Sequence, residues 1–216
     1  MAVFRFRHKE KSMSPADIKL YDFALSGHSH RARLMLSLLD LEYEAVPVNL
    51  REGEHKQPAF LKLNRFGQIP VLVDGDEVIA DSNAILVYLA RRYGHGDWLP
   101  SDPVREARVQ RWLSAAAGPL AFGAAQARLH KWRGVPLDYE LAASRARALL
   151  QVMDEELAER PFLAGDAATI ADVALYTYTA HAPEGDIPLA PYPHVRAWLA
   201  RVEALPGFVA MPPANA

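Results

Sequence analysis

The first regular pattern of hydrophobic and polar positions predicts a strand that leads into a helix. Residues 18–21, Ile-Lys-Leu-Tyr, alternate as a strand does, with one face turned to a core. Residues 31–41 then place Ala32, Met35, Leu36 and Leu39 at helical spacing. A strand followed by a helix is the first step of a βαβ unit, so this part of the chain is expected to be α/β.

The pattern up to residue 92 continues as strands and short helices. Residues 42–48 read as a second strand, and Pro47 places it at a sheet edge because proline cannot donate to a ladder. Residues 49–68 form a polar connection. The remaining elements are a short helix at 58–63, a hairpin of 71–73 and 78–79 around Asp74-Gly75-Asp76, and a helix at 83–92.

Beyond residue 102 the hydrophobic period is helical throughout. Residues 93–102 are rich in glycine and polar groups, which is typical of a linker, and Asp102-Pro103 predicts the N-cap and first residue of a long helix. Gly118-Pro119 is expected to kink or end that helix. Residues 139–159 predict another helix, Thr169 to Asp172 a capping box and 193–199 a last amphipathic helix.

The fold class predicted from these patterns is an α/β N-terminal domain followed by an all-α C-terminal domain. The expected boundaries are a flexible N-terminal extension at 1–16, a first domain at 17–93, a linker at 94–102 and a helical domain at 103–216.

Composition narrows the function classes. The 216 residues are 50% hydrophobic and 23% charged, as in ordinary globular proteins, and the formal net charge of −2 argues against a nucleic-acid partner. The chain has no cysteine, so a protein thiol nucleophile, a disulfide and a thiolate metal site are all excluded. Any thiol chemistry must come from a ligand.

No targeting or membrane segment is evident. Residues 1–12 carry alternating basic groups without an apolar stretch or a cleavage-like site; a flexible tail is the favoured interpretation and a transit peptide the alternative. No run of 18 apolar residues is present, so no membrane span is expected. The sequence predicts a cytoplasmic protein.

The most informative motif is Phe66-Gly67-Gln68-Ile69-Pro70-Val71-Leu72, followed by Asp81-Ser82. A proline inside an apolar run fits a central strand badly and marks a special backbone, here a cis Ile69–Pro70 bond. Such a turn leaves the N–H and C=O of Ile69 free to pair with an extended peptide. Asp81 and Ser82 are expected to open the next helix and to hold the charged ends of an α-amino acid group.

This arrangement resembles the cytosolic glutathione transferase family, from about Ile18 to the C-terminus. The resemblance implies a thioredoxin-like first domain, glutathione as co-substrate and a homodimer. It also implies site residues. Ile69 pairs with the cysteinyl backbone of glutathione, Asp81 takes the γ-glutamyl ammonium, and Ser82 takes its carboxylate. Gln68 and Pro70 belong to the same motif.

The thiol chemistry is expected in Leu25-Ser26-Gly27-His28-Ser29-His30-Arg31. A hydroxyl near a helix N-terminus can donate to a bound thiolate, and the helix dipole favours the negative charge. When the run is aligned on Arg31, Ser26 falls on the thiolate-stabilising serine of the serine-type classes, zeta in particular. His28 and Ser29 are the other catalytic candidates, and simple N-capping is the alternative role of the serines.

The run departs from the zeta pattern, because His28 stands where zeta members have a cysteine. This departure argues against an isomerase of the maleylacetoacetate type. His55 matches the position at which zeta-like members hold the glycine carboxylate of glutathione, with Lys56 beside it; a solvated loop charge is the alternative for Lys56.

A hydrophobic substrate pocket is expected between the two domains, from Leu25, Trp112, Ala116, Phe122 and Tyr178, although aromatic residues at helical spacing also form cores. No histidine spacing suits a metal, so no metal is predicted. The predicted function is a glutathione transferase that attacks a small hydrophobic electrophile. The alternatives are a non-enzymatic glutathione- or ligand-binding protein or dimerisation module of the same fold, and a glutathione-dependent peroxidase or isomerase.

Overall fold

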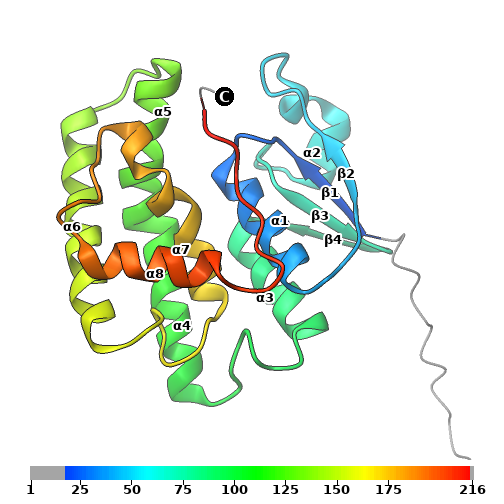
Figure 1. Cartoon of the computed structure of the whole chain (residues 1–216). Coiled ribbons are helices and arrows are strands. Elements are labelled where there is room, and N and C mark those ends of the chain that lie inside the picture. Colours follow the sequence, from blue (N-terminus) through cyan, green and yellow to red (C-terminus); the bar gives the residue numbers. More distant parts are fainter. Residues whose placement is uncertain (1–17, 215–216) are drawn as a thin grey trace, which may run out of the picture.

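The computed structural model describes residues 18–214. It has a lobe that contains a small sheet and a lobe made of helices, and a C-terminal segment runs between the two (Figure 1). The predicted flexible extension at residues 1–16 lies outside the described residues.

The sheet has four strands in the order β2-β1-β3-β4. β1 pairs in parallel with β2 and antiparallel with β3, and β3 pairs antiparallel with β4. β2 is an edge strand, as Pro47 predicts, and the predicted hairpin is formed by β3 and β4, with Gly75 at φ 59° in its turn. The bounds are Ile18–Asp22 for β1, Glu44–Pro47 for β2, Val71–Asp74 for β3 and Glu77–Ala80 for β4.

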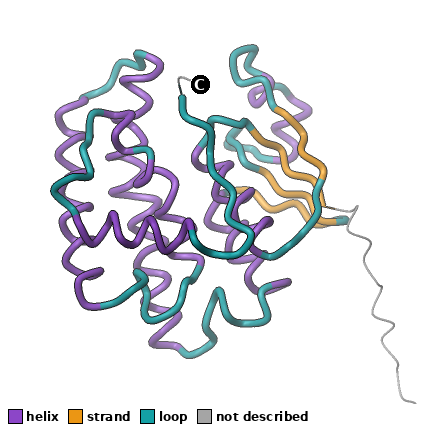
Figure 2. The backbone as a smooth tube through the Cα atoms, viewed as in Figure 1, coloured by secondary structure: helices purple, strands orange, loops and turns teal. Residues whose placement is uncertain are grey.

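Helices cover both faces of this sheet. α1 and α3 lie on the face turned to the helical lobe, and α2 lies on the other (Figures 1 and 2). The bounds are Gly27–Leu38 for α1, Glu54–Lys56 for the short 3-10 helix η2, Pro58–Leu63 for α2 and Ser82–Tyr93 for α3. This arrangement is the thioredoxin-like domain that the sequence predicts.

α1 begins four residues before the predicted helix and ends three residues before its predicted end. Its start is fixed by Ser26, whose Oγ accepts a hydrogen bond from the Ser29 N–H at 3.2 Å. Its end is followed by Asp40 at φ 54°, a left-handed conformation that does not continue a helix. Capping, rather than the apolar period, therefore sets the ends of this helix.

The second lobe is helical. Its elements are α4 (Pro103–Ala115), the π-helical segment η3 (Ala116–Ala125), α5 (Gln126–Arg133), α6 (Tyr139–Glu159), α7 (Ile170–Ala180), the 3-10 helix η4 (Ala182–Gly185) and α8 (Pro193–Glu203). No helix within residues 18–214 is long and apolar enough to cross a membrane. α3 ends at Tyr93 and α4 starts at Pro103, which supports the predicted domain boundaries at 17–93 and 103–216. The division into two domains at these residues stays a prediction.

The Gly118-Pro119 pair does not end the helix. The α-helical pattern stops at Ala115, and the chain continues through Pro119 as the π-helix η3 before α5 begins. The wider winding accommodates a residue that has no N–H to donate. Gly123 in this segment packs so closely on α6 that an added Cβ would lie 2.8 Å from the Ala146 backbone nitrogen. Small side chains thus let η3 stay helical against its neighbour.

One hydrophobic core runs through both lobes. It joins sheet residues such as Leu20 and Leu72 to α1, α3 and the helices of the second lobe, and it includes the fully buried Trp198 of α8. A smaller cluster of Val48, Phe60 and Val71 lies under α2. Since the two lobes share their main core, their relative placement is fixed by packing.

The predicted capping box is present at the start of α7. Asp172 Oδ2 accepts from the Thr169 N–H at 2.8 Å, and Thr169 Oγ1 accepts from the Ala171 N–H at 3.2 Å. Asp172 Oδ1 also accepts from the Leu163 N–H at 3.0 Å and from Trp198 Nε1 at 2.9 Å. Burial raises the pKa of Asp172 above its usual range, although these donors act to lower it. One buried carboxyl group therefore ties α7 to α8 and to the preceding loop.

We predict that Asp172→Ala lowers the free energy of unfolding by about 3 kcal/mol, because it leaves several buried donors without an acceptor. Denaturant unfolding followed by circular dichroism measures the change. Glu159→Ala, which removes an exposed carboxylate at the end of α6, is the matched control and is expected to have little effect. Equal stability of the two variants would contradict this role of Asp172.

Candidate functional site

The loop between β1 and α1 is held by arginines from two sides. Arg33 of α1 donates to both carboxylate oxygens of Asp22 at 2.6 Å and to the carbonyl of Ala24 at 2.7 Å. Arg128 of α5 donates to the carbonyl of Leu25 at 3.1 Å, so the helical domain also contacts this loop. Both contacts fix the backbone that carries Ser26.

The turn before β3 has the special backbone that the sequence predicts. The Ile69–Pro70 peptide bond is cis, and the sheet register of β3 begins only at Val71. The Ile69 backbone therefore lies outside the ladder. Asn64, which is buried, donates to the Gln68 carbonyl at 2.7 Å and accepts from the Phe66 N–H at 3.0 Å. Asn64 thus organises the turn, a role that sequence reasoning missed.

Asp81 is the N-cap of α3, as predicted. Its Oδ1 accepts from the N–H groups of Asn83 and Ala84, both at 2.9 Å. Its φ of 79° is unusual for a residue that is not glycine and costs on the order of 1 kcal/mol or more. The cap bonds hold the carboxylate at the mouth of the helix, and Ser82 behind it is buried.

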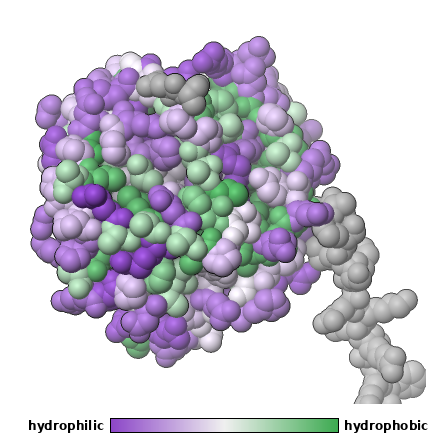
Figure 3. Space-filling view, in the orientation of Figure 1, coloured by the Kyte–Doolittle hydropathy of each residue, from purple (hydrophilic) through white to green (hydrophobic). Residues whose placement is uncertain are grey.

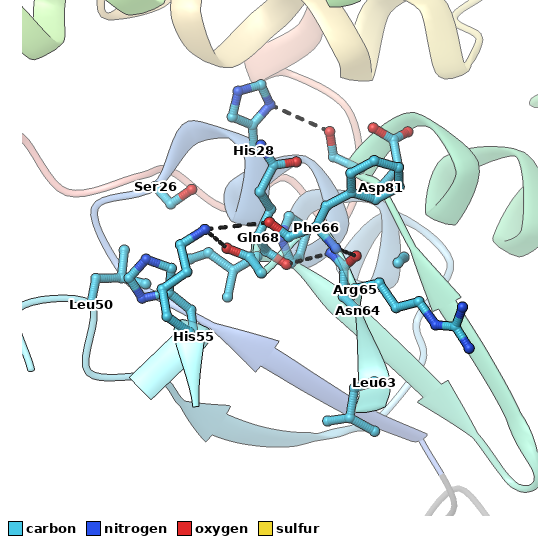
Figure 4. Close-up of a pocket in the computed structure, with 16 residues that line it drawn as sticks. Ser26, His28, Leu50, His55, Leu63, Asn64, Arg65, Phe66, Gln68 and Asp81 are labelled. Carbon is cyan, nitrogen blue, oxygen red and sulfur yellow. Dashed lines mark hydrogen bonds between the residues drawn. The ribbon is translucent and has the colours of Figure 1, made fainter. Parts of the chain in front are cut away.

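These elements surround one cleft of about 830 Å³ (Figure 4). It is lined by residues from the β1–α1 loop, from η2 and α2, from the turn at the cis bond and from the start of α3. The predicted site residues among them are Ser26, His28, His55, Lys56, Gln68, Ile69, Pro70, Asp81 and Ser82. Segments more than fifty residues apart in the chain thus meet at one surface.

A buried arginine lies behind Ser82 of this cleft, a placement that sequence reasoning did not identify. Arg31 is 1% exposed, and its Nη1 lies 3.1 Å from Ser82 Oγ and 3.1 Å from His28 Nδ1. Burial lowers the pKa of Arg31 to about 10. A lone arginine in an amphipathic pattern is ordinarily a surface residue, so the sequence carries no signal for this placement.

His28 and His55 both line the cleft in environments that disfavour the protonated ring. Burial, with a smaller contribution from Arg31, lowers the pKa of His28 to about 3. Burial and the nearby Lys56 lower the pKa of His55. Lys56 Nζ donates to the carbonyls of Gly67 at 2.8 Å and Phe66 at 3.3 Å, so its ammonium is engaged by the turn.

Two residues of α1 are buried away from the cleft. Ser29, the second hydroxyl candidate, is fully buried with no hydrogen-bond partner for its Oγ among the described residues, and it does not line the cleft. His30 is also fully buried, and its ring nitrogens lie 2.8 Å from Thr177 Oγ1 and 2.9 Å from the Val209 carbonyl. The reason is that α7 and the C-terminal segment cover this side of α1.

The residues proposed for a hydrophobic substrate pocket do not come together at the Ser26 cleft. Trp112 and Phe122 line a different cleft of about 760 Å³ between α4, η3 and α6. Ala116 is fully buried, and Leu25 is not among the lining residues of either cleft. Tyr178 lies behind the site, buried, with its ring 5.1 Å from that of His28. The substrate pocket therefore stays a prediction, and of its expected residues only Trp112 and Phe122 share a cleft.

Gly27 explains how Tyr178 reaches this position. A Cβ on Gly27 would lie 2.6 Å from the Tyr178 ring, so only glycine lets α7 approach the first turn of α1 this closely. Within residues 18–214, no group of three or more histidine, aspartate or glutamate side chains is arranged to hold a metal ion.

Comparisons with known proteins agree with this architecture. Residues 16–91 match the family model "Glutathione S-transferase, N-terminal domain", and residues 138–206 match "Glutathione S-transferase, C-terminal domain". The chain is 38% identical over 208 residues to "Glutathione S-transferase 3" of Zea mays, covering 89% of this chain and 92% of that protein.

Two further similarities extend over most of the chain. A "Maleylacetoacetate isomerase" of Pseudomonas aeruginosa is 33% identical, covering 92% of this chain and 97% of that protein. A crystal structure of a glutathione S-transferase from Pseudomonas fluorescens superposes with a TM-score of 0.86 at 36% identity, covering 90% of this chain and 98% of that one.

A thioredoxin-like domain fused to an all-helical domain, with a cleft at a cis-proline, defines the class to which this structure belongs. The chain is a member of the glutathione S-transferase family. It is accordingly a transferase.

Proposed function

We propose that the cleft at Ser26 binds glutathione and activates its thiol for transfer to a small hydrophobic electrophile. Glutathione is then a co-substrate and not a resident cofactor. The observation that carries the proposal is the cleft of about 830 Å³, whose size suits a small molecule. Its lining includes a residue suited to bind each part of the tripeptide.

The γ-glutamyl end is assigned to the start of α3. Asp81 uses Oδ1 to cap the helix, so its second oxygen is available to accept from the ligand's ammonium. The α-carboxylate is assigned to Ser82 at the N-terminus of α3, where the helix dipole favours an anion. The buried cation of Arg31, 3.1 Å behind Ser82 Oγ, adds to this preference.

The rest of the tripeptide is assigned along the cleft. The backbone of Ile69, outside the sheet register, pairs with the cysteinyl unit in the manner of an added strand, with Gln68 and Pro70 shaping that edge. The glycine carboxylate is assigned to His55, with Lys56 beside it. His55 is favoured because the Lys56 ammonium already donates to two carbonyls.

The thiol is assigned to Ser26. Its Oγ accepts from the Ser29 N–H, which leaves the hydroxyl proton free to donate to a thiolate at the N-terminus of α1. A hydrogen bond and a helix dipole both favour the ionised thiol. Catalysis then comes from thiolate stabilisation and from holding two reactants together.

We also propose that the protein acts as a homodimer. The second cleft is apolar and contains the partly exposed Phe122 and Val152, at 50% and 48% exposure. A contiguous exposed apolar surface marks an interaction site. Phe66, 82% exposed on the sheet domain, is suited to enter the cleft of a second copy, and a two-fold axis makes both contacts at once.

The cytoplasm is the proposed location, since reduced glutathione is maintained there and the chain has no cysteine to protect. A non-enzymatic binding protein of this fold, and a glutathione-dependent peroxidase or isomerase, remain the competing functions. The name of one relative, a maleylacetoacetate isomerase, favours the isomerase alternative. His28 in place of the zeta cysteine argues against it.

We predict that Ser26→Ala lowers kcat/KM for the conjugation of glutathione to a chromogenic aryl halide by about 25-fold at neutral pH. That factor is the fall in the thiolate fraction at about pH 7 when the pKa of the bound thiol rises by about two units, from about 6.5 to ~8.5. Steady-state kinetics measure it. Ser26→Thr keeps a hydroxyl group and is expected to lose far less.

Ser114→Ala, an exposed serine of α4, is the matched control and should leave kcat/KM unchanged. A Ser26→Ala enzyme that conjugates as fast as wild type would refute the role of Ser26. Tight glutathione binding without conjugation of any electrophile by the wild type would favour the binding-protein alternative.

For the homodimer we predict that the wild type sediments at twice the 24.0 kDa chain mass and that Phe122→Glu sediments as a monomer. A charge placed in the apolar cleft opposes its burial against a second copy. Analytical ultracentrifugation measures both masses. Leu141→Glu, at a residue of α6 that is 46% exposed and outside the cleft, is the control expected to stay dimeric. A monomeric wild type would contradict the proposal.

A further inference from the structure

Arg31 is buried without a carboxylate beside it. It is 1% exposed, and its side-chain partners are the neutral groups Ser82 Oγ, Asn83 Oδ1 at 3.4 Å and His28 Nδ1. Its Nε and Nη2 have no hydrogen-bond partner among the described residues. Burying a cation with donors left unbonded costs folding free energy, which suggests that Arg31 has a role beyond packing.

The contact with His28 fixes the state of the imidazole ring. A guanidinium can only donate hydrogen bonds, so the Nδ1 atom of His28 accepts in its 3.1 Å contact with Arg31 Nη1. Ser82 Oγ lies 3.4 Å from the same Nδ1 and can donate its hydroxyl proton to it as well. A neutral ring with an accepting Nδ1 carries its proton on Nε2. If Nδ1 were protonated, its N–H group and the N–H group of Arg31 Nη1 would face each other without an acceptor. This agrees with the low pKa of His28.

The Nε2 side of the ring is turned away from Ser82 (Figure 4). His28 lines the same cleft as Ser26, and the edge-to-face contact with Tyr178, at 5.1 Å and 69°, holds the plane of the ring. Of the other titratable groups around this ring, Tyr178 on α7 contacts it, and Asp81 at the N-cap of α3 interacts electrostatically with Arg31 beside it. No described residue forms a hydrogen bond with Nε2.

We propose that Arg31 is a positioning residue that keeps the His28 proton on Nε2, so that His28 offers a neutral N–H donor to an oxygen of the electrophile. The inference rests on the proposed function. It predicts that electrophiles that develop negative charge on an oxygen during attack, such as α,β-unsaturated carbonyl compounds, are favoured over alkyl halides, which develop none.

The step is a conjugate addition. The glutathione thiolate forms a C–S bond at the β-carbon, and the electron pair of the C=C bond moves to give an enolate. The enolate oxygen accepts the hydrogen bond from Nε2–H, and the α-carbon then takes a proton from water. The proton that the thiol released to solvent is thereby returned. Displacement of a halide from an alkyl carbon creates no such oxyanion and gains nothing from His28.

The test compares an aryl enone with benzyl chloride, each conjugated to glutathione by the wild type and two variants. His28→Gln reaches about as far as Nε2 and keeps an N–H donor there, whereas the shorter His28→Asn does not. We expect His28→Asn to lower kcat/KM for the enone by about 100-fold with little change for benzyl chloride. His28→Gln should stay within a few-fold of wild type for both.

A ring-nitrogen NMR spectrum of the protein without substrates provides a readout that does not depend on activity. The expected result is a neutral His28 with its proton on Nε2 from about pH 5 to 8, and a mixture of tautomers in Arg31→Met. A proton on Nδ1 in the wild type would overturn the assignment even if Arg31→Met failed to fold.

The kinetic outcomes separate this inference from the proposed function. If His28→Asn lowered kcat/KM equally for the enone and benzyl chloride, or lowered it for neither, the role of His28 would be overturned. The proposal of glutathione conjugation would be unaffected. A wild type that conjugates neither compound would overturn the proposed function and this inference with it.

Discussion

The structure depends on the burial of α1 on two sides. One side of this helix packs on the sheet, and the other packs on α7 and the C-terminal segment, so eight of its twelve residues are buried. A helix enclosed in this way cannot leave its polar side chains in water. His30, Arg31 and Arg33 are therefore bonded within the protein, and each bond fixes the position of a neighbouring element.

The same enclosure determines where the site lies. The N-terminus of α1 opens at the junction of the two domains, with Tyr178 of α7 pressed against Gly27 and with Arg128 of α5 bonded to the loop before it. On the face in Figure 3, apolar residues lie among polar ones along this junction, where Figure 1 shows the C-terminal segment. The helical domain thus supports the cleft without supplying its lining.

The sequence was informative wherever a local rule decides the structure. Pro70 in an apolar run, the Asp-Gly turn, the N-caps Asp81 and Asp102 and the capping box at Asp172 depend on a few neighbouring residues, and each appears as predicted. Together with the family resemblance they give the fold class and the segments that meet at the cleft.

The sequence was less informative where tertiary packing decides which way a side chain faces. Ser26 and Ser29 are both hydroxyl candidates in the sequence, with Ser26 preferred on its alignment, and α1 turns Ser29 into the core while Ser26 lines the cleft. Trp112 and Phe122 are expected in the substrate pocket because they lie in the first helices of the second domain, whereas both line a separate cleft between α4, η3 and α6. Arg31 was missed because nothing local distinguishes a buried arginine from a solvated one.

The central claim is that the cleft lowers the pKa of a bound thiol, and ultraviolet difference spectroscopy of bound glutathione tests it most directly. The thiolate absorbs at about 240 nm, and its formation can be followed from about pH 5 to 9. The account predicts a midpoint about two units below the ~8.5 of a free thiol. Glutathione that binds but titrates at the value of the free thiol would contradict it.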